Sequence, residues 1–98
     1  MFVHTVYFWL KADISAAEKS EFVEGVRSLT TIPSVKHGWV GTPADTDRPV
    51  IDRTYSYGLT VVFDDLAGHD VYQVHSIHKT FLELKHLWTA VKIYDFEG

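Results

Sequence analysis

The chain has 98 residues, of which 46% are hydrophobic and 22% are charged, and its formal net charge is −4. This length and composition predict one globular domain, which we place over residues 1–98. The acidic balance and the scattered basic residues argue against a nucleic-acid surface, because phosphate binding needs clustered lysine and arginine. No cysteine is present, which excludes disulfides, thiol nucleophiles and cysteine-based zinc sites.

The opening segment has no basic stretch followed by a long apolar run, since Lys11 and Asp13 interrupt the hydrophobic residues early. This pattern predicts neither a signal peptide nor a membrane-spanning helix. We therefore expect a cytoplasmic protein without membrane partners.

Residues 2–10 are mostly β-branched or aromatic and predict a first strand, in which His4 lies among apolar neighbours. A helix follows. Ser15 and Glu18 have the spacing of a capping box, and Pro33 ends the helical pattern because proline cannot continue the hydrogen-bond ladder. Residues 35–40 then predict a second strand, which Gly41 ends.

Residues 42–53 form a polar stretch that predicts a long surface loop, either a lid on a pocket or a decoration of a dimer rim. The clearest alternation of the chain follows over residues 55–63 and predicts a third strand. Asp64 or Asp65 caps a short helix that runs to about Val74.

A further helix begins at Ser76, and residues 90–96 predict a closing strand. The predicted order is β-α-β-β-α-β with the second helical region broken in two, which is the α+β ferredoxin-like arrangement of a four-stranded antiparallel sheet. The helices can cover only one face of this sheet, and the other face carries many apolar residues. We therefore expect a homodimer in which two sheets pack face to face as a dimeric α/β barrel.

Groups able to exchange protons gather late in the chain, where Tyr72, His75 and His78 are bracketed by apolar residues. Histidine titrates near neutrality, and a buried tyrosine hydroxyl needs a partner. The cluster predicts either a pocket that handles a small molecule, with His4 entering from the strand beneath, or a polar seam that holds the core together.

A metal site is the weaker interpretation. His75 and His78 are three residues apart and could share a helical face, but further ligands at recognisable spacing are missing. We expect His75 to act as a cap or to form a hydrogen bond between elements, His37 and His69 to be surface residues, and no metal or cofactor to be required. Haem and flavin monooxygenases share the dimeric barrel architecture, so His78 as an axial ligand is an alternative that rests on fold alone.

The order of these features resembles the stress-responsive dimeric α/β-barrel (Dabb) domain family over nearly the whole chain. Its pattern is matched by the following residues: His4, Ile32-Pro33, Gly41, Val62-Phe63, Tyr72, His75, His78, Phe81, Trp88 and Asp95-Phe96. The resemblance implies a ferredoxin-like protomer and a homodimeric barrel. Functions in the family are mixed, from stress proteins without assigned chemistry to olivetolic acid cyclase, which closes a linear polyketide by aldol chemistry.

The resemblance also implies roles for individual residues. His78 would be the catalytic base, Tyr72 its tyrosine partner and His4 a pocket-lining histidine. The apolar pocket walls that bind substrate would be Phe22, Leu59, Phe81 and Trp88, together with Val26. Val26 stands where the cyclase has a tyrosine, Tyr57 where it has a histidine and Ser76 where a proline is usual, so the walls differ while the base and the tyrosine are kept.

Two functions follow as hypotheses. In the first, the pocket binds a small carbonyl or polyketide-like compound, which His78, Tyr72 and His4 transform by cofactor-free acid/base chemistry. In the second, the chain is a non-catalytic stress-response or accessory protein whose Tyr and His residues are structural. Replacement of His78 separates the two, because a structural role predicts a large loss of stability.

Overall fold

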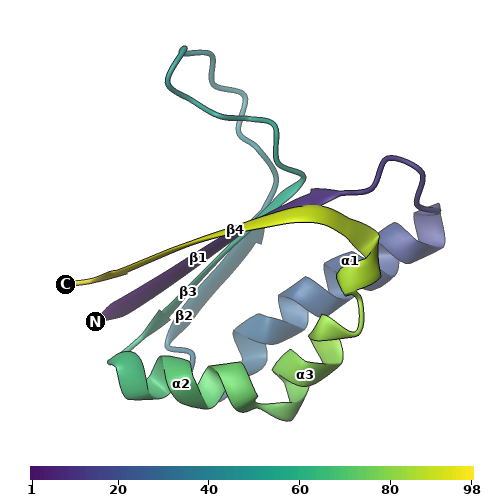
Figure 1. Ribbon diagram of the computed structural model, residues 1–98. Coiled ribbons are helices and arrows are strands. Elements are labelled where there is room, and N and C mark those ends of the chain that lie inside the picture. Colours follow the sequence, from purple (N-terminus) through teal and green to yellow (C-terminus); the bar gives the residue numbers. More distant parts are fainter.

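A computed structural model describes all 98 residues and confirms the predicted order of elements, with a four-stranded antiparallel sheet and the helices on one of its faces (Figure 1). The elements are β1 (Phe2–Leu10), α1 (Ala16–Ser28), β2 (His37–Gly41), β3 (Tyr57–Phe63), α2 (Leu66–Val74), α3 (Ser76–Leu82) and β4 (Trp88–Glu97), with 3-10 turns over Leu29–Thr31 and Lys85–Leu87. The strands are ordered β2-β3-β1-β4, which is ferredoxin-like.

Helix α1 begins where the sequence predicts. Ser15 Oγ accepts a hydrogen bond from the Glu18 amide at 3.1 Å, and Glu18 Oε1 accepts one from the Ser15 amide at 2.9 Å. The helix buries Phe22 and Val26 completely against the sheet. At Gly25 it approaches the end of α3 closely, since an added Cβ would lie 3.2 Å from Phe81 Cδ1 and 2.7 Å from Cδ1 of Leu84, just beyond that helix.

The second helical region breaks at His75, which ends α2 in an extended conformation and caps α3. Its Nδ1 accepts a hydrogen bond from the Ile77 amide at 3.1 Å, which confirms the predicted capping role. The break changes the direction of the chain between α2 and α3. As a result, Tyr72 before the break and His78 after it come together, with ring centroids 5.0 Å apart.

Strand ends differ from prediction by two residues or fewer. Val35 closes a turn by donating its amide to the Ile32 carbonyl, so β2 begins only at His37. Strand β4 starts at Trp88, two residues before the predicted start. The register shifts between Trp9 and Leu10, which lets Leu10 pair with Trp88. At the start of β3, Tyr55 packs on Tyr7 instead of extending the strand.

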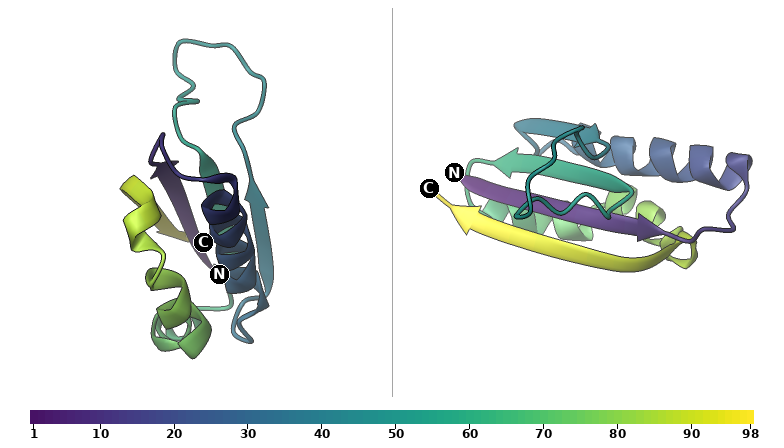
Figure 2. Two further views of the ribbon diagram at one scale, coloured as in Figure 1. Left: turned by 90° about the vertical axis from the view of Figure 1, so that its right-hand side faces the viewer. Right: turned by 90° about the horizontal axis from the view of Figure 1, so that it is seen from above.

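The loop between β2 and β3 projects to the side of the sheet opposite the helices (Figures 1 and 2). Trp9 anchors it there, since Trp9 Nε1 donates a hydrogen bond to Thr54 Oγ1 at 3.0 Å. Within this chain the loop therefore does not cover the space between helices and sheet. This position argues against the lid interpretation of residues 42–53.

We call the sheet face without helices the open face. Alternation along the paired strands places Thr5 and Tyr7 of β1 on it, opposite Tyr94 and Lys92 of β4. Large apolar side chains are exposed there, including Trp39, Tyr94 and Phe96 with 61%, 55% and 57% of their surface accessible. No helix has the length and the apolar run that crossing a bilayer requires.

Candidate functional site

A cavity of about 140 Å³ lies between the sheet and the helices, at the side where β4 forms the edge. It is lined mainly by apolar residues: His4, Val6, Phe8, Leu29, Leu59, Tyr72, Gln73, His78, Phe81, Leu82, Trp88, Val91 and Ile93. We call it the helix-side cavity. An apolar space of about 150 Å³ holds a molecule the size of benzene.

Tyr72 reaches this cavity from α2 and is almost completely buried. Burial raises the pKa of its hydroxyl, because the charged phenolate is poorly solvated there, and no hydrogen bond to the rest of the chain offsets this effect. The phenol therefore stays protonated at neutral pH. Its O–H remains available to donate to an oxygen atom in the cavity.

His78 faces Tyr72 from the first turns of α3. Its Nδ1 is buried and has no hydrogen-bond partner in the chain. Burial lowers the pKa of the imidazole, and the nearby His4 and His69 lower it further because a second positive charge would be repelled. His78 is therefore neutral at neutral pH, which is the form that can accept a proton.

His4 lies beneath them on β1, directly opposite Asp95 in the pairing of β1 with β4. His4 Nδ1 is 2.6 Å from Asp95 Oδ1. Because a carboxylate can only accept, Nδ1 carries the proton, and the neutral ring keeps its lone pair on Nε2. Burial lowers the pKa of His4, although the hydrogen bond and the charge of Asp95 act in the opposite direction.

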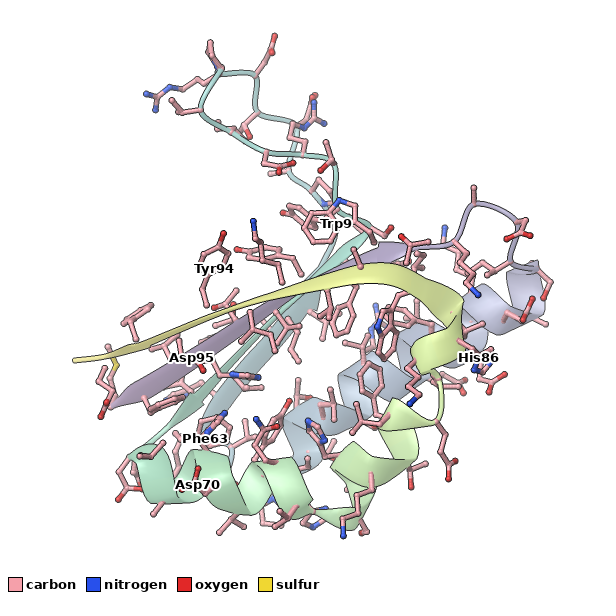
Figure 3. All side chains as sticks on the ribbon, viewed as in Figure 1. Trp9, Phe63, Asp70, His86, Tyr94 and Asp95 are labelled. Atoms are coloured by element: carbon pink, nitrogen blue, oxygen red, sulfur yellow. The ribbon has the colours of Figure 1, made fainter.

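Asp95 is a site residue that sequence reasoning did not single out, except as part of a family pattern. In Figure 3 it lies on the helix side of the sheet, whereas Trp9 and Tyr94 lie on the open face. The sequence feature that could have identified Asp95 is its position in the alternation of β4. Asp95 shares a strand face with Val91 and Ile93, and a carboxylate in such a row needs a partner.

His69 was predicted to be a surface residue, and this prediction was wrong. Only 8% of its surface is accessible, and its ring lies 4.6 Å from Phe2 and 4.8 Å from His4 between centroids. The neighbours Gly68 and Asp70 suggested exposure. The spacing of three residues from Tyr72 was the better signal, because it puts both side chains on the same inward face of α2.

The other predicted wall residues fall into two groups. Leu59, Phe81 and Trp88 line the helix-side cavity. Phe22 and Val26 are fully buried but do not line it. Phe22 lies behind the wall, with its ring centroid 5.9 Å from that of Phe81. The remaining histidines lie elsewhere, since His37 and His86 are exposed and His75 is the helix cap.

Fold and cavity together define a ferredoxin-like protein with a small Tyr and His cluster between its helices and sheet. The match to known families is specific, because residues 2–98 match the stress responsive A/B barrel domain. The chain therefore belongs to this family, as the sequence pattern predicted. No curated protein matches the chain in sequence.

Solved structures share the fold over nearly the whole chain. A family member from Mesorhizobium loti with a ferredoxin-like fold is 26% identical, with a TM-score of 0.77 over 99% of this chain and 95% of that one. A dimeric ferredoxin-like protein of unknown function from Thermobifida fusca is 18% identical, with a TM-score of 0.77 over 97% and 88%. The hydroxynitrile lyase from Passiflora edulis is 17% identical, with a TM-score of 0.77 over 97% and 90%.

Proposed function

We propose that the helix-side cavity binds a small, largely apolar carbonyl compound and that Tyr72 and His78 catalyse proton transfer on it. The observation that carries this proposal is a pair of unused polar groups in an apolar cavity. His78 Nδ1 has no partner, and only burial, with no hydrogen bond, acts on the pKa of the Tyr72 hydroxyl. A purely structural seam would pair such groups, because an unsatisfied buried polar atom is destabilising.

The chemistry follows from the protonation states. Neutral His78 removes a proton from the carbon next to the carbonyl, and the electron pair moves onto the carbonyl oxygen. Tyr72, held in its protonated form, donates a hydrogen bond to this developing enolate oxygen. His4 assists through its free Nε2, because Asp95 holds Nδ1. The step itself requires no cofactor.

The size and lining of the cavity limit the substrate. A volume of about 140 Å³ suits a single ring or a short branched chain, and a long polyketide exceeds it. Leu59, Phe81 and Trp88 would supply the apolar contact, and Phe22 and Val26 would hold that wall in place from behind. The exposed Val91 and Ile93 of β4 lie where the compound would enter.

The proposal includes a homodimer formed through the open face. Trp39, Tyr94 and Phe96 expose apolar surface there, and a two-fold contact would cover it on both copies at once. The similar protein from Thermobifida fusca is described as dimeric. The loop at residues 42–56 stands on this side and would lie at the rim of such a dimer.

Similarity to a hydroxynitrile lyase supports the view that this fold can hold an enzyme. A second candidate function is a non-catalytic stress-response or accessory protein. The observation that favours it is the hydrogen bond between His4 and Asp95, which shows that part of the polar cluster is already paired within the chain.

Titration with cyclohexanone, a ring-sized carbonyl compound, tests the proposal by NMR. We expect shifts in the ring signals of Tyr72 and His78 in the wild type, and loss of the Tyr72 shifts in His78→Ala while the fold is retained. The exposed His86→Ala serves as the matched control and keeps the shifts. A non-catalytic role predicts instead no shifts for any variant, and a large fall in the melting temperature of His78→Ala.

A further inference from the structure

A second polar cluster borders the helix-side cavity and shares His4, together with its partner Asp95, with the proposed function. It consists of His4 from β1, His69 from α2 and Asp95 from β4. Each residue offers one ligand atom, and these three atoms lie within 4.8 Å of one another. Two imidazoles and a carboxylate from three separate elements thus converge on one point between the helix layer and the edge of the sheet.

His69 is the member of this cluster whose polar atoms have no partner in the chain. Both of its ring nitrogens are buried and lack a hydrogen-bond partner. Asp70 Oδ1 approaches Nδ1 at 3.5 Å, but no hydrogen bond forms. A buried imidazole always carries at least one N–H donor and, when neutral, one acceptor, so leaving both unused is costly. Leucine or phenylalanine would fill this position against Phe2 without that cost.

A cation that accepts lone pairs from nitrogen and oxygen would supply the partner that His69 lacks. Asp95 brings a carboxylate to the same point, and its one hydrogen bond in the chain is to His4. A water molecule would satisfy one imidazole nitrogen. A divalent cation accounts for all three residues, because neutral imidazole and carboxylate are its usual ligands.

We propose that His4, His69 and Asp95 form a binding site for a divalent transition-metal ion of the zinc class. Two histidines and one carboxylate match metal sites that keep further coordination positions open. Ligand atoms around tetrahedral Zn²⁺ lie about 3.4 Å apart, given bonds of about 2.1 Å. The side chains must therefore move inward by about 1 Å from their present separation of up to 4.8 Å. Asp95, at the exposed edge strand, has the most freedom to do so.

This inference goes beyond the proposed function and does not depend on it. His78 and Tyr72 carry the proton transfer and lie outside the metal cluster, whereas His4 belongs to both sites and His69 to the metal cluster alone. His69 does not line the helix-side cavity. Replacement of His69 therefore removes a metal ligand without touching the cavity wall, so failure of the metal site and failure of the proposed function give different results.

Zn²⁺ titration of chelator-treated protein by calorimetry tests the proposal, with Co²⁺ absorption as a second readout of imidazole ligation. We expect one ion per chain for the wild type. His69→Leu should weaken binding by about 100-fold or more, since a ligand is lost outright where even outer-shell changes cost about 10- to 100-fold. Asp95→Asn should weaken it as well. His86→Ala, which removes an exposed histidine, should leave binding unchanged.

Stability measurements on the same variants separate loss of the site from loss of the fold. Without metal, His69→Leu should melt at or above the wild-type temperature, because an unpartnered polar ring is replaced by an apolar side chain. Added Zn²⁺ should raise the melting temperature of the wild type but not of this variant. His69→Gln is the alternative variant should His69→Leu fail to fold. Absence of Zn²⁺ binding by the wild type, or equal binding by the His69 variants, overturns the proposal.

Discussion

His4 and Asp95 lie directly opposite each other on β1 and β4, and the hydrogen bond between them fixes which nitrogen of the histidine is free. The two residues are 91 positions apart in the chain. Their pairing depends on the register of the strands, because a slip of one residue would turn Asp95 to the open face. The edge strand β4 thus determines that His4 Nε2, and not Nδ1, is free to interact with a compound in the cavity.

Asp95→Asn should lower the pKa of His4 further, because the carboxylate raises it by hydrogen bond and by charge. We expect stability at neutral pH to fall by about 1 kcal/mol, less than the roughly 1.5–3 kcal/mol usual for a hydrogen bond to a charged group, because Asp95 is partly exposed. NMR titration of the His4 ring and urea unfolding measure the two effects. Asp45→Asn, in the exposed loop, is the control. An unchanged His4 titration would contradict the assigned pairing.

Tyr72→Phe should abolish turnover while leaving the fold at least as stable as the wild type. The ring packs against Phe63 and His4 and is kept by the substitution, whereas the hydroxyl has no hydrogen bond within the chain to lose. Thermal unfolding provides the measurement, with the exposed Tyr94→Phe for comparison. A fall of several degrees in the melting temperature would show that the hydroxyl is a structural group after all.

Stability should increase with pH in the acidic range. Burial lowers the pKa values of His4 and His78 below 6.5, their ordinary value in the unfolded chain. Between the folded-state pKa and 6.5 the unfolded chain binds more protons, so the free energy of unfolding rises with pH and reaches its full value above 6.5.

Urea midpoints measured from about pH 5 to about pH 8 should therefore climb and then level off. His78→Gln, which cannot titrate, should give a shallower climb. A midpoint that is highest at the acidic end would mean that these histidines are stabilised in their charged form, contrary to their burial.

Phe22→Ala should destabilise the fold by about 3–5 kcal/mol, because Phe22 is fully buried against Phe8 and its surroundings would fill the space left behind only in part. The milder Phe22→Leu should lose part of this stability and still bind ligand, since Phe22 is not a lining residue. Urea unfolding measures the loss of stability, and cyclohexanone titration measures whether ligand binding is retained. Loss of binding in a stably folded Phe22→Leu protein would place Phe22 in the wall itself.

Tyr94→Glu should convert a homodimer into a monomer, because it places a charge within the exposed apolar surface of the open face. Val71→Glu, at an equally exposed position on α2, should leave the dimer intact. Light scattering at micromolar concentration distinguishes the two. A wild-type monomer under these conditions would refute the open face as a dimer interface.

Local patterns predicted the fold well. Capping residues such as Ser15 and His75 act on neighbouring amides, so their signals are contained in a few adjacent positions. The alternation of β1 and β3 likewise shows which side chains share one face of the sheet. Strand ends were less predictable, because they depend on partners in other strands, as the pairing of Trp88 with Leu10 illustrates.

The candidate site was predictable only in part. Tyr72 and His78 are close in sequence, and a break between helices was enough to bring them together. The roles of Asp95 and His69 depend on strand register and on the packing of α2 against β1, which no short segment encodes. The same limit explains why Phe22 and Val26 were expected in the wall, whereas neither of them lines the cavity in the structure.

Exchange of the protons next to the carbonyl of cyclohexanone for solvent deuterium tests the central claim most directly. The wild type should accelerate this exchange above the rate in buffer, His78→Ala should reduce it to the buffer rate, and His86→Ala should match the wild type. Exchange no faster with the wild type than in buffer, together with an absence of cyclohexanone binding, would contradict a proton-transfer function for this cavity.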